Sequence, residues 1–179
     1  TLGVTAASPD KEVEDNQVYT FEMRVYDAKG SLLTKTSENL STSANSYVSP
    51  GEFKPGALGL KGYTALLKTG IGFEACGYPQ YSWYVLWNGS KLVPLPLCTS
   101  ISDGGVFYHT ESYVFPEPFE EGGRSHFLGA DRIMFMVEHG ETTYPGDDES
   151  AGWDENSYTR VRPVKWDGKK YIQPEIKDK

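Results

Sequence analysis

The chain has 179 residues, a length that suits one domain with a single substantial core. Its 12 Tyr, 8 Phe and 4 Trp accompany 19 Gly and 11 Pro, a mixture that disordered, collagen-like and coiled-coil chains do not show. The formal net charge of −8 argues against nucleic acid as a partner, because the long-range field repels phosphate groups.

Residues 1–16 show little periodicity, so we expect an exposed terminal segment or linker before a single β-rich domain at 17–179. Alternation from Gln17 to Tyr26 predicts a strand with one buried side. Residues 27–30 have the composition of a turn that ends in glycine, and 31–35 predict the returning strand of a hairpin. The side expected to be buried carries Tyr19, Phe21, Met23 and Val25.

Between 39 and 62 the chain is rich in Ser, Thr, Gly and Pro, which predicts a long irregular connection. Short apolar runs at 63–68 and 71–75 favour strands. The strongest local pattern is Asn88-Gly89 between two apolar runs, which predicts a type I′ turn and a two-residue hairpin loop. In that hairpin one face carries Trp83, Val85, Trp87, Leu92 and Pro94, and the other carries Tyr84, Leu86, Lys91, Val93 and Leu95.

A second hairpin is predicted at Asp167-Gly168, where Lys165 would face Lys170 and the like charges would keep the hairpin at a sheet margin. Residues 106–115 alternate and 133–137 form a continuous apolar run, so both predict strands near the middle of the fold. No segment has the periodicity of a three-turn amphipathic helix. The sequence therefore predicts an all-β fold, an antiparallel β-sandwich or distorted barrel built from hairpins, with long irregular loops and little or no helix.

The chain contains two cysteines, Cys76 and Cys98. If two residues close the Asn88-Gly89 hairpin, Cys98 lies opposite Pro79, and a modest curl of the segment before Pro79 brings the sulfurs together. We therefore expect a disulfide, with unpaired buried thiols as the alternative. A disulfide indicates an extracytoplasmic protein, whether secreted, periplasmic or held at the cell surface.

A first candidate site lies around His109 and Glu111, which are two positions apart and share one face of a strand. Imidazole and carboxylate suit a metal site or an acid–base pair, which Glu138 with His139, or His126, would complete. The alternative is a half-exposed polar stripe with cross-strand partners. Glu111 and Glu138 are also a candidate carboxylate pair of a glycosidase, against the alternative of ordinary surface carboxylates.

A second candidate site is the acidic stretch 146–155. Carboxylates at alternate positions around a glycine resemble the oxygen ligands that calcium needs, although the spacing matches only in part. We expect Asp147, Glu149 and Asp154 to form a weak calcium site of the extracellular kind, with a solvated acidic loop as the alternative.

Three aromatic residues flank the acidic stretch: Tyr144, Trp153 and Tyr158. Exposed aromatic faces beside carboxylates suit stacking on a sugar, and core packing is the competing explanation. No Gly-x-Ser-x-Gly elbow, phosphate-binding glycine loop, His-Glu-x-x-His or dinucleotide motif occurs, so no catalytic residue is assigned.

The expected function follows from this combination of a β fold and polar loops. We expect a non-catalytic binding or structural module of a secreted or cell-surface assembly, with a protein or glycan partner. The alternative is a carbohydrate-binding module or small glycan-active enzyme that uses exposed aromatics and carboxylates. Because no run of about 18 to 20 apolar residues occurs, we expect no membrane insertion.

Overall fold

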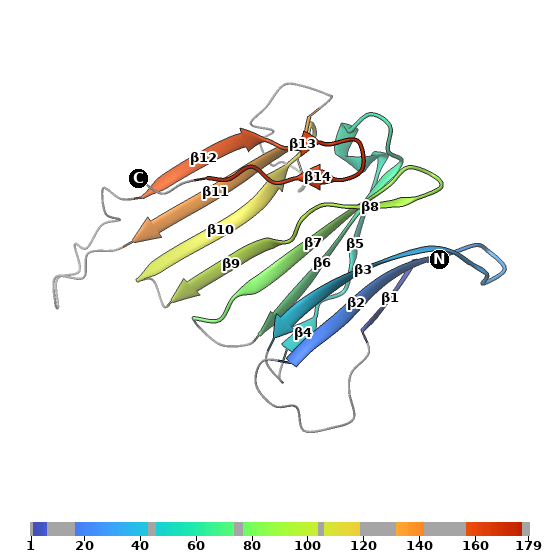
Figure 1. Ribbon diagram of the computed structural model, residues 1–179, viewed down its shortest axis with the longest axis horizontal. Coiled ribbons are helices and arrows are strands. Elements are labelled where there is room, and N and C mark those ends of the chain that lie inside the picture. Colours follow the sequence, from blue (N-terminus) through green and yellow to red (C-terminus); the bar gives the residue numbers. More distant parts are fainter. Residues whose placement is uncertain are drawn as a thin grey trace.

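The computed structural model describes residues 2–6, 17–42, 46–73, 77–103, 106–118, 132–141 and 157–176. In these residues the strands form three antiparallel sheets, and the helical element is one four-residue 3₁₀ turn. The all-β prediction is therefore confirmed, and the arrangement is that of a sandwich-like antiparallel fold (Figure 1). None of the described helices is long or apolar enough to cross a membrane.

The smallest sheets lie at the two ends of the chain. The three-stranded sheet has the order β1-β2-β3. Its strands are β1 (Leu2–Ala6), β2 (Gln17–Tyr26) and β3 (Leu32–Thr42). The two-stranded sheet pairs β13 (Lys165–Trp166) with β14 (Tyr171–Ile172).

The nine-stranded sheet has the order β12-β11-β10-β9-β7-β6-β4, with β5 paired to β6 and β8 paired to β7. Its first strands are β4 (Ser46–Val48), β5 (Glu52–Pro55), β6 (Ala65–Phe73), β7 (Gln80–Trp87) and β8 (Leu92–Pro94). Its remaining strands are β9 (Cys98–Asp103), β10 (Phe107–Val114), β11 (Met134–Glu141) and β12 (Tyr158–Pro163). The 3₁₀ turn η1 (Gly56–Gly59) follows β5.

Strand β2 has the two faces that its alternation predicts. Met23 and Val25 are buried, whereas Val18 on the other face is 68% exposed. Met23 and Val25 pack against Leu67 and Trp83 of the nine-stranded sheet. Burial of apolar side chains such as these holds the two sheets together. Figure 1 shows the blue strands of the three-stranded sheet beside the green strands of the large sheet.

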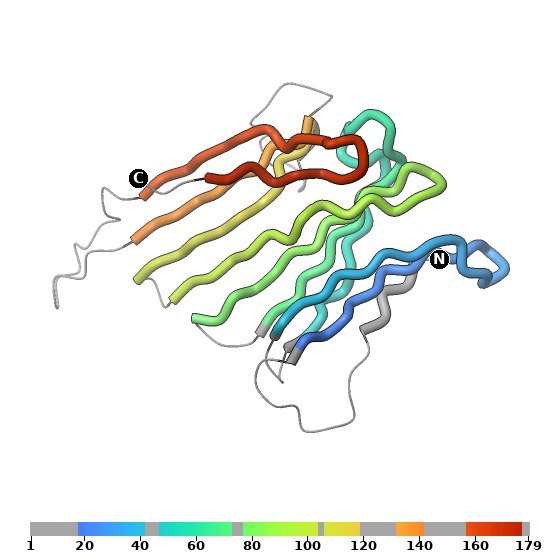
Figure 2. Tube along the Cα trace, in the orientation of Figure 1, coloured from blue at the N-terminus to red at the C-terminus, as the bar shows by residue number. Residues whose placement is uncertain are grey.

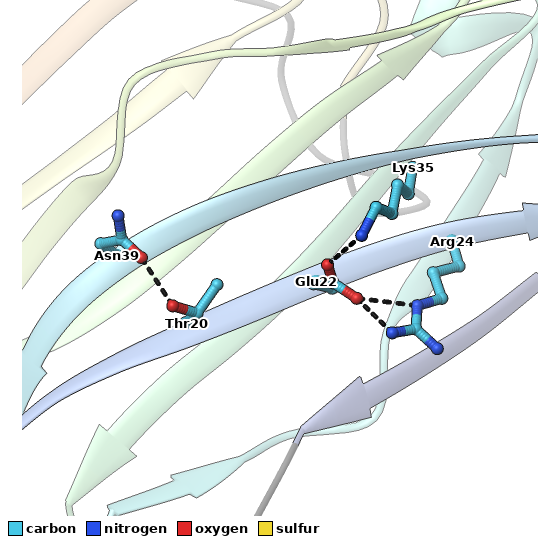
Figure 3. Close-up of polar contacts among 5 residues, drawn as sticks. All are labelled: Thr20, Glu22, Arg24, Lys35 and Asn39. Carbon is cyan, nitrogen blue, oxygen red and sulfur yellow. Dashed lines mark hydrogen bonds and ion pairs between the residues drawn. The ribbon is translucent and has the colours of Figure 1, made fainter.

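The outer face of the three-stranded sheet is polar (Figure 3). Glu22 accepts hydrogen bonds from Lys35 Nζ at 2.6 Å and from Arg24 Nε at 2.8 Å. The Lys35 ammonium, followed by the Arg24 guanidinium, lowers the pKa of the Glu22 carboxyl. Thr20 Oγ1 donates to Asn39 Oδ1 at 2.8 Å. Because water screens such exposed groups, they favour solubility more than stability, and the opposite face supplies the packing.

Strand β7 is buried on both faces, as its two apolar stripes predict. Trp83 and Val85 belong to the core cluster beneath the three-stranded sheet. Tyr84 and Leu86 belong to a second cluster, which η1 and the residues around β13 and β14 cover. β7 therefore separates two cores.

The predicted turn at Asn88-Gly89 is wrong by one position. The strands pair Trp87 with Leu92, and Asn88 N donates to Lys91 O at 3.3 Å, so Gly89 and Ser90 are the central residues. The Asn88 side chain causes this shift, because its Oδ1 accepts the N–H groups of Ser90 and Lys91. Since the register moves by two residues, every side chain keeps its predicted face.

The second hairpin differs from its prediction in the same way. Lys165 pairs with Ile172, and Asp167 Oδ1 accepts the N–H groups of Lys169 and Lys170. The expected Lys165–Lys170 contact is therefore wrong. The hairpin nevertheless stands outside the large sheet, as Figure 2 shows in red at the C-terminal end of the trace.

Two further expectations about the organisation of the chain are corrected. Residues 2–6 form strand β1, which pairs with β2, so regular structure begins earlier than expected. The region 39–62 contains the end of β3, the strands β4 and β5, and η1 instead of one irregular connection. Its Pro and Gly residues separate these short elements and do not prevent them.

Candidate functional site

A row of three rings crosses the sheet from β10 to β12. Strand register places His109 opposite His139 and His139 opposite Tyr158. The ring centroids of His109 and His139 are 5.8 Å apart, and the His139 ring stacks on Tyr158 at 5.3 Å. His139 Nε2 lies 3.1 Å from Glu141 Oε1, and the Arg160 guanidinium carbon lies 4.2 Å from the Tyr158 ring centroid. The predicted polar stripe with cross-strand partners is thus formed.

Beside this row is a hollow of about 380 Å³, which we call the histidine hollow. The strands contribute polar groups from His109, Glu111 and Tyr158 and apolar surface from Val137. The segment 173–176 closes one side, where the chain runs back from β14 (Figure 2). Tyr158 is the one predicted sugar-binding residue that lies within the described ranges, and it lines this hollow.

A second hollow of about 330 Å³ lies on the neighbouring strands. We call it the serine hollow, because hydroxyl groups from three strands line it. Lys68 and Tyr47 also contribute to its wall. Its serine, threonine and glutamine residues are Ser49, Gln80, Ser82, Ser100, Thr110 and Ser112.

Two glycines of β6 shape the wall of the serine hollow. A Cβ atom on Gly70 would lie 2.6 Å from Ser49 Oγ, and one on Gly72 would lie 3.2 Å from the Tyr47 hydroxyl. Ser49 Oγ accepts the Gly70 N–H at 2.8 Å. The missing side chains therefore let β4 and the residue after it fold closely over β6.

Glu111 lines both hollows and joins them. The pairing of β9 with β10 ends at Ser100 and Thr110. The next residue, Thr99, donates its N–H to Glu111 Oε2 at 2.7 Å. A main-chain donor thus fixes the carboxylate, which keeps further acceptor capacity for a ligand.

Both hollows border the same core cluster. Val137 in the histidine hollow and Tyr84 in the serine hollow belong to it. Burial raises the pKa of the Tyr84 hydroxyl. The Tyr84 hydroxyl therefore stays neutral, and Lys68 Nζ lies 5.7 Å from its ring centroid.

The predicted Glu111–Glu138 carboxylate pair is wrong. Register places Glu111 opposite Val137, and Glu138 is opposite Thr110. Because side chains alternate along a strand, Glu138 points to the other face of β11 from Val137 and His139. His126, the other residue expected to complete this group, lies outside the described residues.

The predicted disulfide finds no support. Cys98 is a buried free thiol opposite Ser82, and Cys76 lies outside the described residues. Gly77 donates its N–H to Ser102 O at 2.9 Å, four residues along β9 from Cys98.

The calcium site stays a prediction, because Asp147, Glu149 and Asp154 lie outside the described residues. The same holds for Tyr144 and Trp153 as sugar-binding residues. Within the ranges that the structure describes, no group of three or more His, Cys, Asp or Glu side chains could hold a metal ion.

The sequence singled out His109, Glu111 and Tyr158, but it did not reveal the serine hollow. The residues of that hollow come from five strands and lie between positions 47 and 112. One available signal was the alternation of Gly70 and Gly72 with apolar residues, which indicates a close backbone approach inside a strand.

Comparisons of the chain with family models, with curated proteins and with solved structures found no match. The class of the protein is therefore defined by its architecture, an all-β antiparallel fold that carries two joined polar hollows on its large sheet.

Proposed function

We propose that the protein is a non-catalytic binding module that holds a glycan against its nine-stranded sheet. The observation that supports this is the pair of polar hollows that meet at Glu111. Each hollow lies within the 300–1,000 Å³ typical of ligand sites. Hydroxyl, amide and carboxylate groups are complementary to the hydroxyl groups of a sugar, since each can accept a hydrogen bond from one.

A glycan suits these hollows better than a protein surface does. The buried centre of a protein interface is depleted in charged side chains and enriched in large aromatic ones. The serine hollow instead has Ser82, Ser100 and Thr110 within it, and Lys68 and Glu111 in its walls. Ser100 Oγ and Thr110 Oγ1 lie 3.2 Å apart, so neighbouring strands present hydroxyl groups side by side.

A glycan array tests the proposal, with the wild type compared with Ser82→Trp. The indole of this variant would fill the serine hollow, so we expect loss of the glycans that the wild type retains. Ser37→Trp is the matched control, because Ser37 is exposed on the three-stranded sheet and away from both hollows. The proposal fails if the wild type retains no glycan, or if Ser82→Trp and Ser37→Trp bind equally well.

A small glycan-active enzyme is the second candidate, and one observation favours it. Glu111 and Glu175 both line the histidine hollow, and paired carboxylates are the usual groups for glycoside hydrolysis. Release of new reducing ends from a bound oligosaccharide measures this activity. Loss of the release in Glu175→Gln, with binding retained, would assign the enzyme function in place of the non-catalytic one.

We also propose an extracytoplasmic location, as part of a secreted or cell-surface assembly. Glycans are abundant at cell surfaces, which is consistent with the proposed ligand. Fractionation of the native cells with an antibody against the chain tests the location. Recovery with cytoplasmic markers would reject it.

A further inference from the structure

The two hollows share Glu111 as a lining residue, so a single ligand that fills both would cross the strands of the sheet. We infer that the ligand is a linear oligosaccharide without carboxylate or sulfate groups, which crosses the strands with its middle at Glu111. This inference rests on the proposed glycan-binding function. It adds the length, the direction and the charge of the ligand.

The length follows from the strand order. The path of such a ligand begins beside Tyr158 on β12 and ends beside Tyr47 on β4. These strands are the two ends of the seven-strand order β12-β11-β10-β9-β7-β6-β4. With about 4.8 Å between neighbouring strands, the path is about 29 Å long. A single sugar would leave most of this path empty, whereas an oligosaccharide would fill both hollows.

The charge follows from the groups along the path. Glu111 and Glu175 line the histidine hollow, and Glu141 lies beside the His139 ring. In the serine hollow, Lys68 Nζ already lies 3.9 Å from Glu52 Oε1. The chain as a whole carries a net charge of −8. Anionic sugars would therefore be repelled, and neutral sugars would not.

Glu111 acts at the junction of the two hollows. The Thr99 N–H holds its Oε2 atom, so the carboxylate is oriented before a ligand arrives. Its remaining acceptor sites can take hydrogen bonds from sugar hydroxyl groups. A Glu111→Gln variant would keep an oxygen for Thr99, but its NH₂ group would replace the acceptor that faces the ligand.

Calorimetric titration with neutral β-glucan, xylan and chitin oligomers of one to six units tests the inference. For the oligomers that bind, we expect the affinity to rise at least tenfold between two and five units and then to level off. Glu111→Gln should lower the affinity for the long oligomers about tenfold, as expected for loss of a charge-assisted hydrogen bond. Glu38→Gln, on the three-stranded sheet and in the lining of neither hollow, should leave the affinity unchanged.

Blocking variants test the two halves of the path separately. Ser82→Trp fills the serine hollow and Gln173→Trp fills the histidine hollow, so each should lower the affinity of a pentamer to that of a dimer. Circular dichroism and melting temperatures show whether each variant folds. If a tryptophan variant does not fold, the affinity of Glu111→Gln for the long oligomers tests the inference instead. Ser37→Trp serves again as the control.

The outcomes separate this inference from the proposed function. Equal affinity for dimers and pentamers, or a loss with Ser82→Trp but none with Gln173→Trp, would overturn the long ligand and leave glycan binding in place. Tighter binding of oligogalacturonate than of the neutral oligomers would overturn the charge argument alone. The absence of binding to any oligomer and to the glycan array would reject the proposed function itself.

Discussion

At the scale of single residues, Glu111 has a structural role as well as its proposed binding role. The Thr99 N–H, at the point where the β9–β10 pairing ends, depends on Glu111 Oε2 as its acceptor. We expect Glu111→Ala to destabilise the fold by about 1–3 kcal/mol, because a partly buried donor loses its partner. Glu111→Gln should cost less than half as much, since its carbonyl oxygen can accept the same bond.

Urea denaturation measures both Glu111 variants, with Glu138→Ala as the control on the neighbouring strand. Equal destabilisation by Glu111→Ala and Glu111→Gln would show that the negative charge matters and the hydrogen bond does not. Glu111→Ala therefore measures the contribution of Glu111 to the stability of the fold. Glu111→Gln keeps the hydrogen bond from Thr99, so it measures the contribution of the carboxylate to ligand binding.

Cys98 is the residue whose chemistry responds most directly to burial. Burial, followed by the nearby Glu111 carboxylate, raises the pKa of the Cys98 thiol above its ordinary value of 9.0. In a Cys76→Ser variant we expect Cys98 to resist alkylation by iodoacetamide at pH 9 and to react once urea unfolds the chain. Mass spectrometry reads out the modification.

The same pKa shift has a consequence for stability. Because the folded pKa of Cys98 is higher than the unfolded value, ionisation favours the unfolded chain. The contribution of the thiol is therefore fully present below about pH 9 and is lost as the pH rises further. A Cys98 that is oxidised to a disulfide in the native wild type, and unreactive even in urea, would contradict the free thiol.

At the scale of elements, η1 is a turn of left-handed backbone. Gly56 and Gly59 have φ of 72° and 77°, and Ala57 and Leu58 between them have φ of 48° and 53°. Left-handed backbone costs an L-residue with a Cβ atom about 1–2 kcal/mol. Ala57 and Leu58 are buried in the second core cluster, so packing compensates for this conformation.

Gly56 isolates the backbone cost of η1, because a Cβ atom there would have no neighbouring atom within 4 Å. We expect Gly56→Asn to lower the free energy of unfolding least. Gly56→Ala should lower it by about 1 kcal/mol, and Gly56→Val should lower it further. This order follows the ease with which each residue adopts positive φ. Urea denaturation of the three variants gives the order, and equal stability of the Val and Asn variants would contradict the left-handed turn.

The elements also show which features the sequence could predict. The faces of β2 and β7 were predicted correctly, because alternation depends on the two-residue period and survives a register shift of two. The turns were misplaced because Asn88 and Asp167 accept main-chain N–H groups through their side chains. Such side-chain acceptors compete with the type I′ geometry that the Asn-Gly and Asp-Gly pairs alone suggest.

At the scale of the whole molecule, the candidate site was only partly predictable. His109, Glu111 and Tyr158 could be selected because their residue types carry recognisable chemistry. The serine hollow could not, since it depends on the order of β4, β6, β7, β9 and β10 in the sheet. Pairing between distant strands is decided by tertiary packing, and no local period in the sequence encodes it.

The packing of the three-stranded sheet on the large sheet predicts that the two unfold together. Met23 is 1% exposed and packs in one cluster with Trp83 of β7, which is 0% exposed. We expect Met23→Ala to lower the free energy of unfolding by about 2–5 kcal/mol through lost burial and a residual cavity. Val18→Ala on the exposed face of the same strand should change it by less than about 0.5 kcal/mol.

The measurement follows urea denaturation by tryptophan fluorescence and by far-ultraviolet circular dichroism. The fluorescence signal includes Trp83 and Trp87, which pack in the cluster that the two sheets share, whereas circular dichroism reports on all strands. Because the shared cluster joins the two sheets, both signals should change at one midpoint, and Met23→Ala should move both midpoints equally. If Met23→Ala lowered the fluorescence midpoint and left the main circular dichroism transition in place, the three-stranded sheet would be a separate unit attached to an independently stable nine-stranded sheet.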